Sequence, residues 1–184
     1  MRRSDDGTML KELLRRNREV ILRRWRDLIV RSYPANTARF LQLESDRFHN
    51  PVGHALADET ARIFDCLVED SPAQGLEEVA EMTIKIRSVQ DFTPSEAVGF
   101  IFLLKTSIRE QLATEPNRAY LDQLLDLESR IDELALAIFD RYMCCREKVF
   151  QIRVDEIKKR SVGCFNVNSQ AATPRGRAED IGTV

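Results

Sequence analysis

Glycine and proline are scarce in this sequence, with seven and six residues among 184. Both residue types interrupt helices and form turns, and the alternation of β-branched and polar residues that marks half-exposed strands is almost absent. Charged residues are plentiful, at 32% of the chain. This combination predicts an all-α fold, and the length allows a single domain with a sizeable core.

The signatures of enzymes are also missing. The sequence contains no glycine-rich phosphate-binding loop, no nucleophile elbow and no paired histidine and glutamate at metal-binding spacing. Its two histidines, His49 and His54, lie five residues apart across a predicted helix start, where exposed histidines are usually solvated. We therefore predict that the protein is not an enzyme and holds no metal or cofactor.

No segment has the pattern of a secretion signal or a membrane span. The first ten residues, MRRSDDGTML, lack an apolar segment and a cleavage site. The uncharged stretch Ala97–Leu104 would reach only about 12 Å as a helix, against roughly 30 Å for the core of a bilayer. The four cysteines lack paired spacing, which favours a reducing compartment. We expect a cytoplasmic protein without membrane insertion.

The fold is expected to be organised around a helix that starts at Thr93. Thr93 can cap this helix with its hydroxyl, Pro94 fits the first helical position, and Glu96 can bond back to the Thr93 amide. Ala97–Leu104 then follows without a charge. Because a helix that is apolar all round must be covered on every side, this segment predicts the central helix of a bundle.

Two further helices are predicted upstream of this central helix. Asn50 can cap a helix that begins at Pro51 and runs to about Asp70. Apolar residues at spacings of three and four predict another helix over 76–90.

Charge is unevenly distributed along the chain, although the formal net charge is only −2. Residues 1–31 carry ten Lys/Arg against five Asp/Glu, whereas residues 41–80 carry two against nine. The asymmetry indicates self-association, an oriented partner or a pair of solvated helix faces. Glu19 and Asp27 interrupt the arginine-rich helix predicted over 9–30, so we expect no nucleic-acid binding.

The last predicted helix is unusually long, because residues 118–160 contain neither glycine nor proline. At about 1.5 Å per residue it would reach roughly 64 Å, whereas a compact domain of this size is only about 40 Å across. Part of it is therefore expected to extend beyond its own domain. One apolar stripe, with steps of four and three, comprises Ile131, Ala135, Ile138, Tyr142, Cys145, Val149 and Ile152. A second stripe comprises Leu136, Phe139, Met143, Phe150, Val154 and Ile157. Two stripes predict two packing partners, the chain's own domain for the first and a second copy of the chain for the second.

The connection that precedes the central helix contains the candidate ligand-binding or signal-coupling residues Arg87, Gln90 and Asp91. They lie at a predicted helix end beside the apolar Phe92. Polar groups in such a place must bond across the connection or bind something small in the core, and both interpretations stay open. Beyond the predicted domain at 1–160, residues 161–184 have no periodicity and are expected to form a flexible tail. This tail holds Cys164, the redox candidate.

Three stretches of the sequence carry a resemblance to a known family. They are HNPVG at 49–53, RSVQDFTPSEAVGFIFLLK at 87–105 and RIDELALAIFDRYMCCREKVFQIRVDE at 130–156. Together they resemble the N-terminal sensor domain of stressosome co-antagonists of the RsbR type, the RsbRD N-terminal domain family. The resemblance implies a non-haem, globin-like helical bundle that dimerises and runs on through its last helix. In the co-antagonists that helix leads into a STAS domain with phosphorylatable threonines, which we expect to be missing here.

The family resemblance implies a function in regulation. We predict a non-enzymatic sensory or regulatory module that is a homodimer, binds a protein partner and signals through its long C-terminal helix. Stand-alone members of the family also resemble small accessory proteins of the membrane redox complexes of dissimilatory sulfur metabolism. The alternative is therefore an accessory subunit of such a complex, which would use Cys164 to contact a thiol carrier.

Overall fold

The computed structural model describes part of the chain, in two units. The described residues are 6–34, 38, 50–70, 76–90, 92–113, 115 and 118–171. The first unit comprises Met1–Arg146 and the second Glu147–Val184. Each unit is described by itself below.

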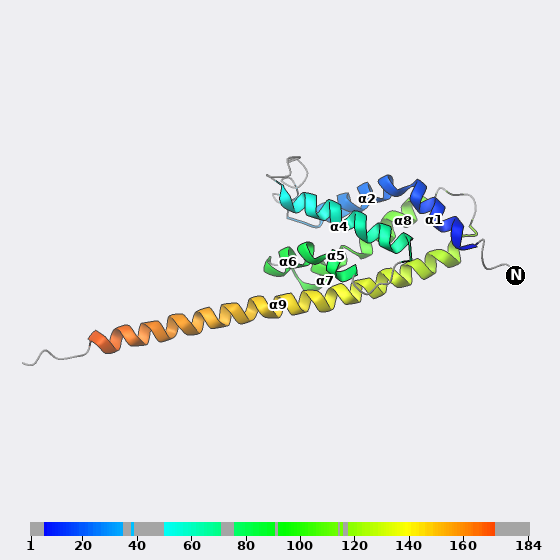
Figure 1. The fold of residues 1–184 in the computed structure, drawn as a ribbon. Coiled ribbons are helices and arrows are strands. Elements are labelled where there is room, and N and C mark those ends of the chain that lie inside the picture. Colours follow the sequence, from blue (N-terminus) through cyan, green and yellow to red (C-terminus); the bar gives the residue numbers. More distant parts are fainter. Residues whose placement is uncertain are drawn as a thin grey trace, which may run out of the picture. The chain divides into compact units, whose positions relative to one another are not determined.

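The described residues contain helices and no strand, which confirms the predicted all-α bundle (Figure 1). The helices are α1 (Asp6–Arg16), α2 (Arg18–Arg31), α4 (Pro51–Val68), α5 (Leu76–Val79), α6 (Glu81–Val89), α7 (Pro94–Gly99), α8 (Phe102–Leu112) and α9 (Leu121–Ala171). The first unit holds α1 to α8 and the start of α9. The globin-like arrangement of these helices stays a prediction.

Two predicted helix starts are confirmed, because local side chains cap them. The Asn50 side chain accepts a hydrogen bond from the Gly53 amide at 2.8 Å, and α4 begins at Pro51. At α7 the Thr93 hydroxyl accepts from the Glu96 amide at 3.3 Å, and the Glu96 carboxylate accepts from the Thr93 amide at 2.9 Å. This reciprocal pair is the predicted capping box.

The central helix is divided where the prediction made it continuous. The indole nitrogen of Trp25 donates to the Phe100 carbonyl oxygen at 2.7 Å, and both residues are buried. A continuous helix would offer this carbonyl to the Leu104 amide, which instead donates to Ile101 at 3.1 Å. The helix therefore separates into α7 and α8. The prediction that Ala97–Leu104 is covered on every side is also wrong at one residue, because Phe102 is 44% exposed.

Two other predicted helices are each divided in the structure. The helix predicted over 9–30 separates into α1 and α2 at Asn17, whose side chain and backbone amide both donate to the Leu13 carbonyl oxygen, at 2.9 Å and 3.1 Å. The helix predicted over 76–90 separates into α5 and α6. There the Glu59 carboxylate from α4 accepts from the Met82 amide at 2.8 Å and so caps the new helix start.

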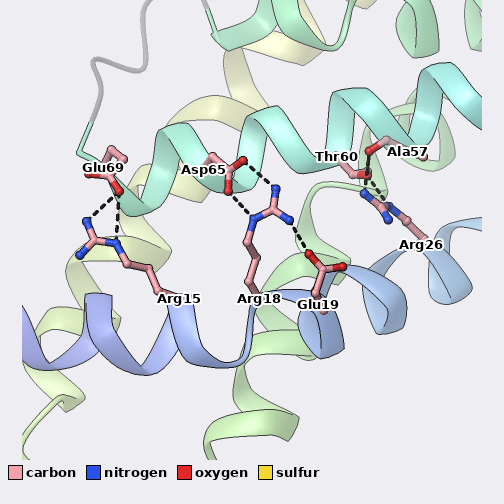
Figure 2. Close-up of polar contacts among 8 residues, drawn as sticks. All are labelled: Arg15, Arg18, Glu19, Arg26, Ala57, Thr60, Asp65 and Glu69. Carbon is pink, nitrogen blue, oxygen red and sulfur yellow. Dashed lines mark hydrogen bonds and ion pairs between the residues drawn. The ribbon is translucent and has the colours of Figure 1, made fainter.

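Part of the uneven charge of the sequence is neutralised within the first unit. Arginines of α1 and α2 face acidic residues of α4 (Figure 2). Arg15 pairs with Glu69 at 2.7 Å, and both guanidinium ends of Arg18 bond the two oxygens of Asp65 at 2.7 Å. Neighbouring Arg26 donates instead to uncharged groups of α4. The paired side chains are partly exposed, so these arginines fit the predicted explanation by two solvated helix faces.

The first apolar stripe of α9 is buried over its first four residues, as predicted, and the prediction fails beyond them. Cys145 and Val149 are half-buried, and Ile152 is 59% exposed. Ile131, Ala135, Ile138 and Tyr142 are each at most 2% exposed. They pack in the same apolar core as residues of α2, α4 and α8. This burial places the start of α9 against its own domain.

The second unit continues α9 as a helix from Glu147 to Ala171. The helix runs past the predicted end at Arg160, and Gly163 lies within it. One glycine costs a helix only about 1 kcal/mol relative to alanine, which is too little to end it. The predicted boundary between a domain at 1–160 and a tail at 161–184 is not tested, since side chains of 161–171 and all of 172–184 lie outside the described part.

Within the described part of the chain, no helix combines the length and the apolar composition needed to cross a bilayer.

Candidate signal-coupling site

Arg87 lies in the last turn of α6 with its whole side chain buried. Its Nη1 donates to the Glu96 carbonyl oxygen at 2.8 Å. Its Nε donates to the Tyr33 hydroxyl at 3.2 Å, and Nη2 donates to the Ser32 hydroxyl at 3.4 Å. The guanidinium therefore joins the segment after α2, the end of α6 and the first turn of α7.

Three aromatic rings surround this guanidinium. Its central carbon lies 4.7 Å from the ring centre of Tyr33, 4.8 Å from that of Phe92 and 5.0 Å from that of Phe100. The rings of Tyr33 and Phe92 meet edge to face, with their centres 5.3 Å apart. These contacts are favourable because the face of an aromatic ring attracts a cation.

No carboxylate among the described residues forms an ion pair with Arg87. Burial lowers the pKa of Arg87, and the neighbouring Tyr33 hydroxyl opposes that effect. Arginine nevertheless stays protonated at neutral pH because its ordinary pKa is so high. The site is thus a buried cation held by uncharged groups, which is an expensive arrangement for a protein to keep.

Gln90 follows one turn later and lies at the same connection. The residue is half-buried, and its side-chain oxygen is buried without a hydrogen-bond partner in the described structure. Such an acceptor costs about 1–3 kcal/mol relative to one that is paired. The predicted trio is therefore partly assembled, with Arg87 and Gln90 at one connection, while Asp91 lies outside the described residues.

Helix α9 holds this connection through its backbone. The Arg146 Nη1 donates to the Ser88 carbonyl at 3.1 Å and to the Gln90 carbonyl at 3.4 Å. One turn earlier, the buried Tyr142 hydroxyl donates to the Phe92 carbonyl at 3.3 Å. Sequence reasoning missed Arg146. Its spacing of four from Tyr142, which places both on one helix face, was the available signal.

The six candidate interface residues of the second stripe are exposed or half-buried. In the first unit, Leu136 is 68% exposed and Phe139 is 39% exposed. In the second unit, Phe150 is 67% exposed and Ile157 is 64% exposed. Met143 and Val154 are half-buried in their respective units. The side chain of Cys164, the redox candidate, lies outside the described part.

A search of sequence families matched residues 19–157 to the RsbT co-antagonist protein rsbRD N-terminal domain. The chain belongs to this family. The match includes Arg87, Gln90, Tyr142 and Arg146. Searches of curated proteins and of solved structures found no match.

Family membership gives the site its context. The RsbRD N-terminal domains are regulatory, sensor-type domains of the stressosome context, and they take part in protein–protein complexes.

Proposed function

We propose that the protein is a dimeric, non-enzymatic regulatory module that receives a signal at the connection between α6 and α7. It passes this signal to a protein partner through α9. The observation that carries the proposal is the set of hydrogen bonds from Tyr142 and Arg146 to backbone carbonyls of the connection. A backbone shift at these carbonyls changes the hydrogen bonds that Tyr142 and Arg146 can form.

The proposed signalling requires that the connection between α6 and α7 has more than one arrangement, and two features support it. Arg87 is buried without a carboxylate partner among the described residues, and the side-chain oxygen of Gln90 is buried and unpaired there. A ligand or protein that donated a hydrogen bond to this oxygen would favour one arrangement over the other. Such differential binding shifts the population of conformations, and that shift is the signal.

A second copy of the chain is the proposed partner for the second apolar stripe. The stripe presents Leu136 and Phe139 in the first unit and Phe150 and Ile157 in the second. Sedimentation at micromolar concentration is expected to give twice the chain mass of 21.2 kDa. A single species at the chain mass would contradict the dimer.

Transmission through α9 is tested with spin labels attached at Val154→Cys in a background free of other cysteines. Arg146→Gln removes the bonds to the Ser88 and Gln90 carbonyls, so it is expected to change the distance distribution between the two labels of a dimer. The matched control is Arg141→Gln, which removes the same charge one turn earlier from an exposed contact with Glu81. Identical distributions for both variants would contradict the proposed transmission.

The accessory-subunit alternative concerns a different partner, a redox complex of dissimilatory sulfur metabolism. It rests on the family resemblance and on Cys164, whose side chain is outside the described residues. Copurification separates the two functions, because an accessory subunit should bring its complex along. Cys164→Ser should then weaken that association and leave the label distances unchanged.

The non-haem character and the cytoplasmic location are also proposals. An absorption spectrum of the purified protein without a Soret band is the result expected for the first. Fractionation of cells with the chain in the soluble cytoplasmic fraction is expected for the second.

A further inference from the structure

A cavity of about 180 Å³ lies in the first unit between α1, the end of α4 and the first turns of α9. Its apolar wall consists of Leu10, Leu14, Leu67, Val68 and Leu127, all buried. Its polar rim consists of Lys11, Asp70, Gln123, Asp126 and Arg130. The cavity is remote in sequence from the connection at Arg87, and the two lining sets share no residue.

Asp70 occupies an unusual position at this rim. It follows the end of α4 with a φ of 53°, in the left-handed region that favours glycine. Its carboxylate contacts Lys11 Nζ at 2.5 Å and Arg130 Nη1 at 2.6 Å. An aspartate thus stands where a glycine would be unstrained, and it bridges two cations.

The two cations of the rim are less exposed than the carboxylate between them. The side chains of Lys11 and Arg130 are 31% and 23% exposed, whereas that of Asp70 is 61% exposed. The Arg130 guanidinium is also fixed by donating to the Leu67 carbonyl at 2.8 Å. Because the carboxylate is the most exposed member, it can be replaced by another carboxylate at little cost in desolvation.

We propose that this cavity binds a small carboxylate with a short apolar chain, and that Asp70 is an internal competitor for the same cations. The ligand carboxylate bonds Lys11 and Arg130, and its chain packs on the leucines of the wall. At about 30 Å³ per water-sized group, the volume admits a chain of about six such groups. The exposed carboxylate of Asp126 disfavours a second negative charge, so the ligand class is a monocarboxylate.

Hexanoate is a suitable probe, titrated into the full chain by calorimetry at millimolar concentrations. Saturable binding is expected. Acetate lacks the apolar chain, and hexylamine carries the wrong charge, so neither should bind. Saturable binding of acetate or hexylamine as strong as that of hexanoate, or no binding of hexanoate to any variant, would overturn the proposal.

Two substitutions and one control make the test specific. Arg130→Gln should weaken hexanoate binding about tenfold, because a charge-assisted hydrogen bond is lost. Asp70→Gly removes the competitor and fits the backbone at this position, so it should strengthen binding about fivefold. Glu69→Gln is the control, since it breaks the adjacent pair with Arg15 and leaves the lining unchanged. Its affinity should equal that of the unmodified chain.

The hexanoate affinity of Asp70→Gly distinguishes a ligand site from a set of ion pairs that only stabilises the fold. Tighter hexanoate binding supports the internal competitor. Unchanged or weaker binding would show that Asp70 only ties the helices together, and it would overturn the proposal. If Arg130→Gln does not fold, Lys11→Gln replaces it with the same expected loss of affinity. The label distances at Val154 test the signalling function separately, so either proposal can fail alone.

Discussion

Arginines have opposite surroundings in two regions of the first unit. On the face between α1, α2 and α4, Arg15 and Arg18 are partly exposed and pair with acidic residues (Figure 2). At the connection between α6 and α7, Arg87 is fully buried and its described partners are uncharged. The first region pairs arginines of the basic N-terminal segment with carboxylates of the acidic segment. The second holds a cation where burial is costly and compensates it with hydrogen bonds and aromatic rings.

The largest effect is expected for Arg87→Ala. This change removes a buried side chain with its three described hydrogen bonds and leaves a cavity between aromatic rings. The free energy of unfolding should fall by about 3–4 kcal/mol, measured by urea denaturation. Arg87→Met fills most of the space without the charge and should cost clearly less. Equal losses for the two variants would show that hydrogen bonds, and not packing, dominate the site.

The next effect is expected for Tyr142→Phe. This substitution deletes the hydroxyl that α9 donates to the Phe92 carbonyl and keeps the buried ring. The loss in unfolding free energy should be about 1 kcal/mol. Amide hydrogen exchange should speed up around residues 92–98 more than at α4. Uniform acceleration across the unit would mean that the bond does not act locally.

Glu59 is a buried acid, in contrast to the exposed acids that pair with Arg15 and Arg18. Burial raises the pKa of Glu59, opposed by the bonds it accepts from Thr83 and Met82. The folded state therefore holds this proton more tightly than the unfolded state, whose pKa is near 4.5. The contribution of protonated Glu59 to the free energy of unfolding is fully present below pH 4.5. It is lost as the pH rises through the higher pKa of the folded state.

Glu59→Gln is the variant that isolates this effect. It keeps an acceptor for the Met82 amide but cannot ionise. Above pH 4.5, the unmodified chain should lose stability relative to Glu59→Gln as pH rises, measured by urea denaturation of both at each pH. A constant difference between the two across this range would contradict the buried-acid explanation.

The smallest effect is expected at the exposed pairs. Arg18→Gln removes the bonds to Asp65 and Glu19 and should lower the unfolding free energy by about 0.5–1 kcal/mol. The loss should shrink in 1 M salt, where charges are screened within about 3 Å. The loss for Arg87→Ala should hardly change with salt. A salt-independent loss at Arg18 would remove the distinction between the two regions.

Helix starts were predictable where a cap and its target lie within a few residues. Asn50 with Gly53 and Thr93 with Glu96 are such pairs, and both were predicted from spacing. Helix interruptions were less predictable. The separation of α7 from α8 depends on Trp25, 75 residues away from Phe100 in sequence. Partners that lie far apart along the same chain leave no local sequence pattern.

The candidate site was predicted in part for the same reason. Arg87 and Gln90 were identifiable as polar residues at a helix end beside an apolar one. Their hydrogen bonding differs, because Arg87 has three described partners and the Gln90 side-chain oxygen has none among the described groups. Arg146 bonds the backbone carbonyls of Ser88 and Gln90. A sequence does not reveal which backbone carbonyls the fold leaves available for such bonds.

The sequence by itself determined the helical class, the two side-chain caps and the buried first half of the first α9 stripe, because each rests on periodicity or on contacts between near neighbours. The tertiary structure decided which charges meet a carboxylate and which are buried among rings. It also decided where a distant side chain bonds a backbone carbonyl that would otherwise accept a hydrogen bond within a helix. Those outcomes depend on groups that are far apart along the chain, and only the packed helices bring them within bonding distance.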